Sequence, residues 1–99
     1  MTNYDVCIAF VNGSNNGCNS LNMHISMDGR RLYSYRTCIA EKLPNGAIIL
    51  NKTKYSVTTS KHQSHLLSAI NMYASTLKTY RTDKIVPRGT CDLTNYYSK

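Results

Sequence analysis

The stretch TKYSVTTSKHQSHLL, residues 53–67, joins two sequence patterns and predicts where the chain changes from strand to helix. Residues 54–58 alternate as in a β-strand. Ser60 is followed three residues later by Gln63, which is the spacing of a helix capping box. The stretch therefore predicts the last strand of a sheet, followed directly by a helix that begins at Lys61.

The residues after this corner predict one amphipathic helix from Lys61 to about Tyr80. Spacings of four, three and four residues place the apolar positions on one stripe, which consists of Leu66, Ile70, Tyr73 and Leu77. Lys78 and Arg81 are expected at the C-terminal end of the helix, where positive charge suits the helix dipole.

The residues before the corner predict an antiparallel meander of four to five strands, separated by Gly-, Asn- and Pro-containing turns. The expected strands are residues 6–11, 21–27, 30–43, 47–50 and 54–58. The expected turns are residues 12–17, the type I′ turn Asp28-Gly29, Pro44-Asn45-Gly46 and residues 51–53. In the strand 30–43, alternation places Tyr33, Tyr35 and Ile39 on one face.

Together these elements predict an α+β fold, in which an antiparallel β-meander of four to five strands packs on one α-helix in the C-terminal half of the chain. The 99 residues are expected to form a single domain, residues 1–99. Ile85 and Val86 are expected to add a short edge strand. From about residue 90 the chain is expected to form a flexible tail that either docks or stays mobile.

No apolar run approaches the roughly 20 residues of a membrane span, which excludes a transmembrane helix. The start of the chain lacks the basic and long apolar regions of a secretory signal, so we expect a protein that is made and kept in a cytoplasm. The four cysteines include no C-x-x-C pair, which argues against a zinc ribbon. Cys7 and Cys38 are expected to be buried as small hydrophobic residues, whereas Cys18 and Cys91 lie in polar, loop-like sequence.

The chain is basic, with 12 Lys and Arg residues against 5 acidic ones and a net charge of +7. This balance favours a polyanionic partner, such as RNA, DNA or an acidic protein face, although charge alone also suits a protein that is merely soluble. It argues against an acidic mimic of DNA.

The first candidate binding site combines Arg30, Arg31 and Arg36 with Tyr33 and Tyr35. Arginines between tyrosines can pair with phosphates while the rings stack on bases. The same residue types anchor protein interfaces, and the tyrosines can also belong to a small tyrosine-rich core.

The second candidate site is formed by Lys52, Lys54 and Lys61, which surround the expected start of the helix. Unpaired backbone amides at a helix start attract anions, and nearby lysines would reinforce a phosphate contact. The alternative is that Ser60 satisfies one of these amides and the lysines only solvate the surface.

His62 and His65 are three residues apart and could share a helix face as metal ligands, with His24 or a cysteine as a third ligand. Either histidine could also act as a general base beside Ser60 or Ser64. His62 continues the apolar stripe of the helix, so we expect it to pack at the sheet edge and to belong to the binding surface. We predict that the protein is not an enzyme and that it has no catalytic residue, metal or cofactor.

The run LYSYRTCIAEKLPNGAIILNKTKYSVTTSKHQSH, residues 32–65, is similar to a domain of unknown function in small proteins encoded by bacteriophages and prophages. Its most characteristic part is LNKTKYSVTTSKHQ, residues 50–63. The resemblance implies an origin rather than a mechanism, since it carries no catalytic residues over to this chain.

Small phage accessory proteins often block host machinery. By this analogy we expect an inhibitor of host defence, of the anti-CRISPR type, that occupies a nucleic-acid or protein surface of the effector. The expected partner is a host defence ribonucleoprotein or nuclease, with RNA or DNA as possible direct ligands and no membrane. The alternatives are a DNA- or RNA-binding accessory protein acting on phage nucleic acid, and a small hydrolase built on His62 or His65.

Overall fold

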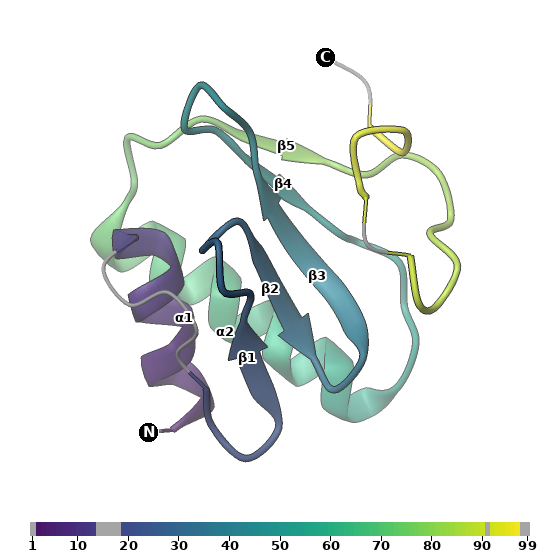
Figure 1. Cartoon of the computed structure of the whole chain (residues 1–99), viewed down its shortest axis with the longest axis horizontal. Coiled ribbons are helices and arrows are strands. Elements are labelled where there is room, and N and C mark those ends of the chain that lie inside the picture. The colour runs from purple at the N-terminus through teal and green to yellow at the C-terminus, as the bar shows by residue number, and fades with distance from the viewer. Residues whose placement is uncertain (1, 14–18, 91, 98–99) are drawn as a thin grey trace.

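A computed structural model describes residues 2–13, 19–90 and 92–97 of the chain. Within these ranges the chain forms two helices and five strands (Figure 1). In chain order they are α1 (Asn3–Asn12), β1 (Met23–Ile25), β2 (Arg31–Ser34), β3 (Thr37–Lys42), β4 (Ile48–Leu50), α2 (Val57–Tyr73) and β5 (Thr79–Arg81). The predicted α+β class is confirmed.

The five strands form one sheet in the order β1-β2-β3-β4-β5. From β1 to β4 each strand pairs antiparallel with the next, as the expected meander requires. β5 pairs parallel with β4, because α2 carries the chain along the sheet before β5 begins. The sheet is therefore mixed rather than wholly antiparallel.

The apolar run at residues 6–11 belongs to a helix, so the predicted first strand was wrong. Thr2 caps α1, since its side chain accepts a hydrogen bond from the Asp5 amide while the Asp5 side chain accepts one from the Thr2 amide. Gly13 ends the helix in the left-handed conformation, with φ of 68°. A short apolar run fits a buried strand and a buried helix equally well, and these two caps decide between them.

The predicted strand over residues 30–43 is two strands, β2 and β3, joined by a tight turn at Tyr35 and Arg36. Tyr35 has φ of 56°, an uncommon conformation for a bulky residue. A bulge also interrupts the alternation of side chains, since Leu32 pairs with Ala40 and Tyr33 pairs with Cys38. Ile39, the extra residue, therefore joins the main core on the opposite face from Tyr33.

The expected turns at Asp28-Gly29 and Pro44-Asn45-Gly46 lie where the sequence placed them, but the first has a different type, and residues 51–53 form no turn. The Gly29 amide donates to the Ser26 carbonyl, and Gly29 alone of the pair Asp28-Gly29 has positive φ, so the turn is not type I′. The Gly46 amide likewise donates to the Leu43 carbonyl in the Pro44-Asn45-Gly46 turn. Most of the expected loop 12–17 lies outside the described residues.

Helix α2 begins at Val57, so the predicted strand 54–58 and the helix start at Lys61 were both wrong. The helix is capped by Ser56, whose side chain accepts a hydrogen bond from the Thr59 amide. Ser60 lies inside the helix and forms no capping box with Gln63. The helix ends at Tyr73 rather than Tyr80, because the following residues pair with β4 as β5.

Both helices pack on one face of the sheet, where they bury the larger core. The buried residues of α2 there are Leu66, Ala69 and Ile70, as the predicted stripe requires, whereas Tyr73 is 53% exposed. Helix α1 contributes Val6, Cys7, Ala9 and Phe10. No helix within the described residues is both long and apolar enough to cross a bilayer.

The segment after β5 covers the opposite face of the sheet (Figure 1). Val86 and Leu93 are fully buried there against Cys38 and Ile49. The described residues 92–97 therefore dock, and residues 85–86 form no strand. Cys7 and Cys38 are both buried, as predicted, whereas Cys18 and Cys91 lie outside the described residues.

Candidate anion-binding groove

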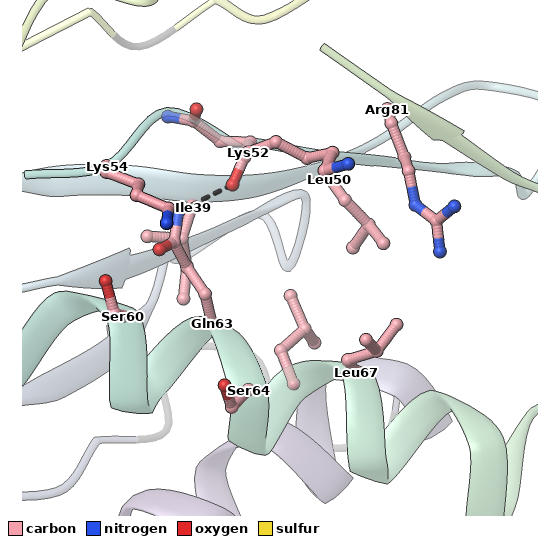
Figure 2. Close-up of a pocket in the computed structure, with 11 residues that line it drawn as sticks. Ile39, Leu50, Lys52, Lys54, Ser60, Gln63, Ser64, Leu67 and Arg81 are labelled. Carbon is pink, nitrogen blue, oxygen red and sulfur yellow. Dashed lines mark hydrogen bonds between the residues drawn. The ribbon is translucent and has the colours of Figure 1, made fainter.

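A groove of about 520 Å³ lies between α2 and the segment that leaves β4 (Figure 2). Its volume is typical of a small-ligand pocket. The residues that line it are Ile39, Leu50, Asn51, Lys52, Lys54, Ser60, Gln63, Ser64, Leu66, Leu67 and Arg81.

The charged side chains of the groove are all cationic: Lys52, Lys54 and Arg81. The two lysines come from the segment after β4, and Arg81 comes from β5, where it lies opposite Leu50 in the parallel register. Figure 2 shows the Arg81 side chain extending toward α2 at one end of the groove, with Lys54 at the other. Because none of the described lining residues is acidic, these charges remain available for an external anion.

The segment that carries the two lysines is held to α2 by Gln63. Its side-chain amide donates to the carbonyl of Asn51 at 2.6 Å and to that of Thr53 at 3.1 Å. The Lys52 amide donates to the Thr82 hydroxyl at 2.9 Å, which ties the same segment to the chain beyond β5. The lysine backbone is therefore fixed before any ligand arrives, which reduces the entropy lost on binding.

The floor of the groove is apolar and its helix wall is polar. Leu50 and Leu66 are buried at the floor, and Leu67 is partly exposed. Ser60 and Ser64 lie one helical turn apart on α2 and present hydroxyl groups. The groove thus offers cations and hydroxyls to an anion such as phosphate, and an apolar surface to the rest of the ligand.

Lys61, the third lysine of the predicted set, is exposed on α2 next to Ser60 but does not line the groove. Sequence reasoning missed Arg81, because it placed that residue at the end of a longer helix. It also gave Gln63 a capping role instead of its contact with the lysine segment. The pairing of β5 with β4 is a tertiary feature, so no local pattern marks Arg81 as a partner of Lys52 and Lys54.

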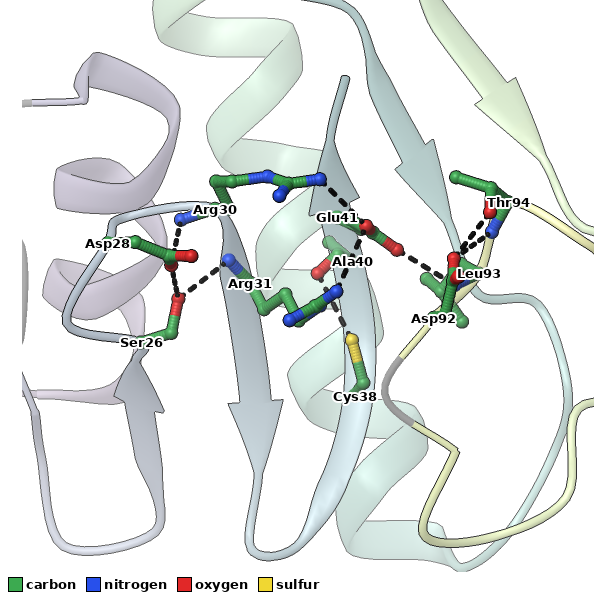
Figure 3. Close-up of polar contacts among 10 residues, drawn as sticks. All are labelled: Ser26, Asp28, Arg30, Arg31, Cys38, Ala40, Glu41, Asp92, Leu93 and Thr94. Carbon is green, nitrogen blue, oxygen red and sulfur yellow. Dashed lines mark hydrogen bonds and ion pairs between the residues drawn. The ribbon is translucent and has the colours of Figure 1, made fainter. Parts of the chain in front are cut away.

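Arg30 and Arg31 bind a buried carboxylate, that of Glu41 (Figure 3). Their Nη2 atoms lie 3.3 Å and 3.5 Å from Glu41 Oε2. The other carboxylate oxygen accepts a hydrogen bond from the Leu93 amide at 2.8 Å. These arginines therefore hold the C-terminal segment on the sheet, and their charge is partly neutralised inside the protein.

The other members of the predicted arginine–tyrosine site are divided between two places. Tyr33 stacks on His24, with ring centroids 4.7 Å apart, and packs against the C-terminal segment. Tyr35 and Arg36 are exposed at the turn between β2 and β3. The structure thus does not gather Arg30, Tyr33 and Arg36 on one open surface.

His62 is buried, 2% exposed, in a polar network between α1, α2 and β2. The Asn3 side-chain amide donates to His62 Nε2 at 3.1 Å, so Nδ1 carries the ring proton and donates to the Ser34 hydroxyl at 2.5 Å. Asn3 Oδ1 in turn accepts from the Ser20 hydroxyl. Burial lowers the pKa of His62, and the nearby His65 lowers it further.

This arrangement gives His62 a structural role at the sheet edge. Both ring nitrogens are occupied by Asn3 and Ser34, and the Ser34 hydroxyl is itself fully buried. Ser60 and Ser64 line the groove on α2 instead. In the part of the chain that the structure describes, no three His, Cys, Asp or Glu side chains are placed to hold a metal ion.

The chain belongs to a family of unknown function (DUF8033), which it matches over residues 7–86. The match includes every lining residue of the groove, from Ile39 to Arg81, and the run 32–65. No curated protein and no solved structure matches the chain.

Proposed function

We propose that the protein is a non-enzymatic binding protein that contacts the phosphate backbone of a nucleic acid through the groove of Lys52, Lys54 and Arg81. The observation that carries the proposal is this set of cations above an apolar floor, with no acidic residue among the described lining. The net charge of +7 supports it, since long-range attraction brings a polyanion to a basic surface.

The apolar part of the groove favours a nucleic acid over a simple inorganic anion. Phosphates would contact the lysines and Arg81, and hydroxyls of Ser60 and Ser64 would add hydrogen bonds. Leu67, which is 39% exposed, would contact the sugar or base. Such contacts position a nucleic acid without reading its sequence, so we expect binding with little sequence preference.

We further propose that the protein is phage-encoded and inhibits host defence. Its foremost candidate target is a CRISPR effector. It would occupy the guide RNA or target DNA of the effector and so block its use. The resemblance of residues 32–65 to small phage proteins supports this setting. The alternative of an accessory protein on phage nucleic acid uses the same groove and differs only in the partner.

The test of the groove is a salt titration of binding to a fluorescently labelled oligonucleotide. The double variant Lys52→Gln/Lys54→Gln should weaken binding and reduce the slope of log K against log salt by about 1.4 to 1.8, because two phosphate contacts are lost. The control, Lys78→Gln/Lys84→Gln, removes the same charge away from the groove. Equal losses in both variants would show that net charge, and not the groove, governs binding.

The test of the partner is a pull-down from the bacterial host with and without nuclease treatment. The inhibitor is supported if a ribonucleoprotein is captured and stays bound after nuclease treatment because its RNA is protected within the complex. Recovery of naked nucleic acid alone favours the accessory protein. Turnover of a phosphoester or peptide substrate that His62→Gln abolishes, in a variant that still folds, would contradict the non-enzymatic role.

A further inference from the structure

A second hollow, of about 350 Å³, lies at the start of α2. Its lining residues are Tyr35, Arg36, Thr37, Ser56, Thr59 and Arg88. The first turn of α2 connects the two sites, because Ser56 and Thr59 line this hollow while the next residue, Ser60, lines the groove. A ligand chain that leaves the groove along this turn would meet the second hollow.

The two arginines of the hollow have no acidic partner among the described residues. Both ion pairs that join described residues involve Glu41, with Arg30 and Arg31. Arg36 and Arg88 are exposed and come from separate parts of the chain, the β2–β3 turn and the C-terminal segment. They therefore present two available charges to one cavity, from two separate segments.

Arg88 is positioned by a fixed aromatic ring. Its guanidinium carbon lies 5.6 Å from the centroid of the Tyr55 ring, within the range of a cation–π contact. The Tyr55 hydroxyl donates to the Val86 carbonyl at 2.5 Å and accepts from the Asn51 side-chain amide at 3.0 Å. Two hydrogen bonds thus fix the hydroxyl end of Tyr55, and Arg88 lies against a ring that is held in place.

Tyr35 supplies an open aromatic face. Its side chain is 51% exposed, and its ring centroid lies 5.9 Å from that of the buried His62, which supports it from the protein side. Among the described residues it is the one non-glycine residue with positive φ. Glycine or asparagine would occupy this turn position at lower cost, so a tyrosine here indicates a use for its side chain.

We infer that this hollow takes one nucleotide of a single-stranded nucleic acid, with the base stacked on Tyr35 and the flanking phosphates bound by Arg36 and Arg88. An aromatic ring can stack on a base only when that base is not paired inside a duplex. The inference rests on the proposed function, which it deepens: the preferred ligand of the groove and the hollow together is a single strand rather than a duplex.

The experiment compares one short oligonucleotide sequence, as a labelled single strand and as a blunt duplex, by fluorescence anisotropy at constant salt. The wild-type protein should bind the single strand more tightly. Tyr35→Leu should weaken single-strand binding at least about five-fold and leave duplex binding nearly unchanged. Tyr35→Phe keeps the ring and should bind as the wild type does, and Arg88→Gln should weaken single-strand binding several-fold.

The outcomes separate this inference from the groove. Equal affinity of the wild type for single strand and duplex, with dependence on Lys52 and Lys54, overturns the single-strand inference and leaves the groove. Single-strand binding that depends on Tyr35 but not on the two lysines supports the hollow and overturns the groove. No binding to either oligonucleotide overturns both. The comparison within the wild type remains decisive even if Tyr35→Leu fails to fold.

Discussion

Glu41 should be one of the most sensitive positions in the molecule, because three groups from two segments depend on its carboxylate. It is 1% exposed, binds Arg30 and Arg31, and accepts from the Leu93 amide (Figure 3). In Glu41→Ala the buried Leu93 amide loses its acceptor, which costs about 1–3 kcal/mol. The side chain of Arg31, 26% exposed, also loses its partner, and the total should reach about 3–4 kcal/mol.

A loss of this size is a large part of the roughly 5–15 kcal/mol that stabilises a domain. It should lower the melting temperature by roughly 12 °C or more. Urea unfolding followed by circular dichroism measures the free energy of unfolding. Hydrogen exchange at the Leu93 amide shows whether the C-terminal segment opens first, as we expect.

Two matched variants control the result. Glu41→Gln keeps an acceptor for the Leu93 amide and should cost less, about 1–2 kcal/mol. Arg30→Gln removes the partner whose side chain is 47% exposed and should cost less than about 1 kcal/mol. A Glu41→Ala protein within about 1 kcal/mol of the wild type, or an equal cost for Arg30→Gln, would refute the reasoning.

Three further predictions follow from the cores. Leu66→Ala should lower the free energy of unfolding by about 2–5 kcal/mol, since Leu66 is 1% exposed beneath the groove. A smaller loss, measured by urea unfolding, would mean that the site collapses around the smaller residue. The pKa of His62 is lower in the folded protein than in the unfolded chain, so the unfolded chain takes up a proton first as pH falls. The free energy of unfolding of the wild type should therefore decrease between pH ~7.5 and ~5.5 more steeply than that of His62→Gln. Parallel curves for the two proteins would contradict this. Burial raises the pKa of Cys7 to about 12, so its alkylation, followed by peptide mass mapping, should be much slower in the native protein than in urea, and equal rates would exclude a buried thiol.

The parts of the fold that the sequence predicted are those set by local chemistry. The turn at Pro44-Asn45-Gly46 and the hairpin at Asp28-Gly29 lie where glycine and proline place them. The helical stripe of Leu66 and Ile70 is recognisable because its period differs from that of a strand. These signals were sufficient to place β1, β4 and the buried face of α2, but they left β2 and β3 as one strand.

The parts that it did not predict depend on competing or distant interactions. Residues 6–11 fit strand and helix alike, and the caps at Thr2 and Gly13 were the deciding signal. The turn at Tyr35 carries no glycine or asparagine, so nothing local separates β2 from β3. β5 exists because residues 79–81 find β4, which no local periodicity records.

The candidate site was predictable to the same extent. Lys52 and Lys54 were recognised from their position before the helix, and they line the groove. Arg81 required knowledge of β5, and the separation of Arg30 and Arg31 from Arg36 required knowledge of Glu41. Charge could be counted from the sequence, but its neutralisation by a buried acid could not.

The parallel pairing of β5 with β4 has a consequence for the order in which the molecule assembles. The neighbouring hairpins of the meander close short loops, whereas β5 can dock only after the chain has spanned the whole of α2, and such distant contacts form slowly. We therefore expect β5, with Arg81, to be among the last elements to join and the first to detach. A polyanion held by Arg81 and the two lysines would link β5 to the segment after β4. By mass action it would protect the native chain against transient detachment of β5.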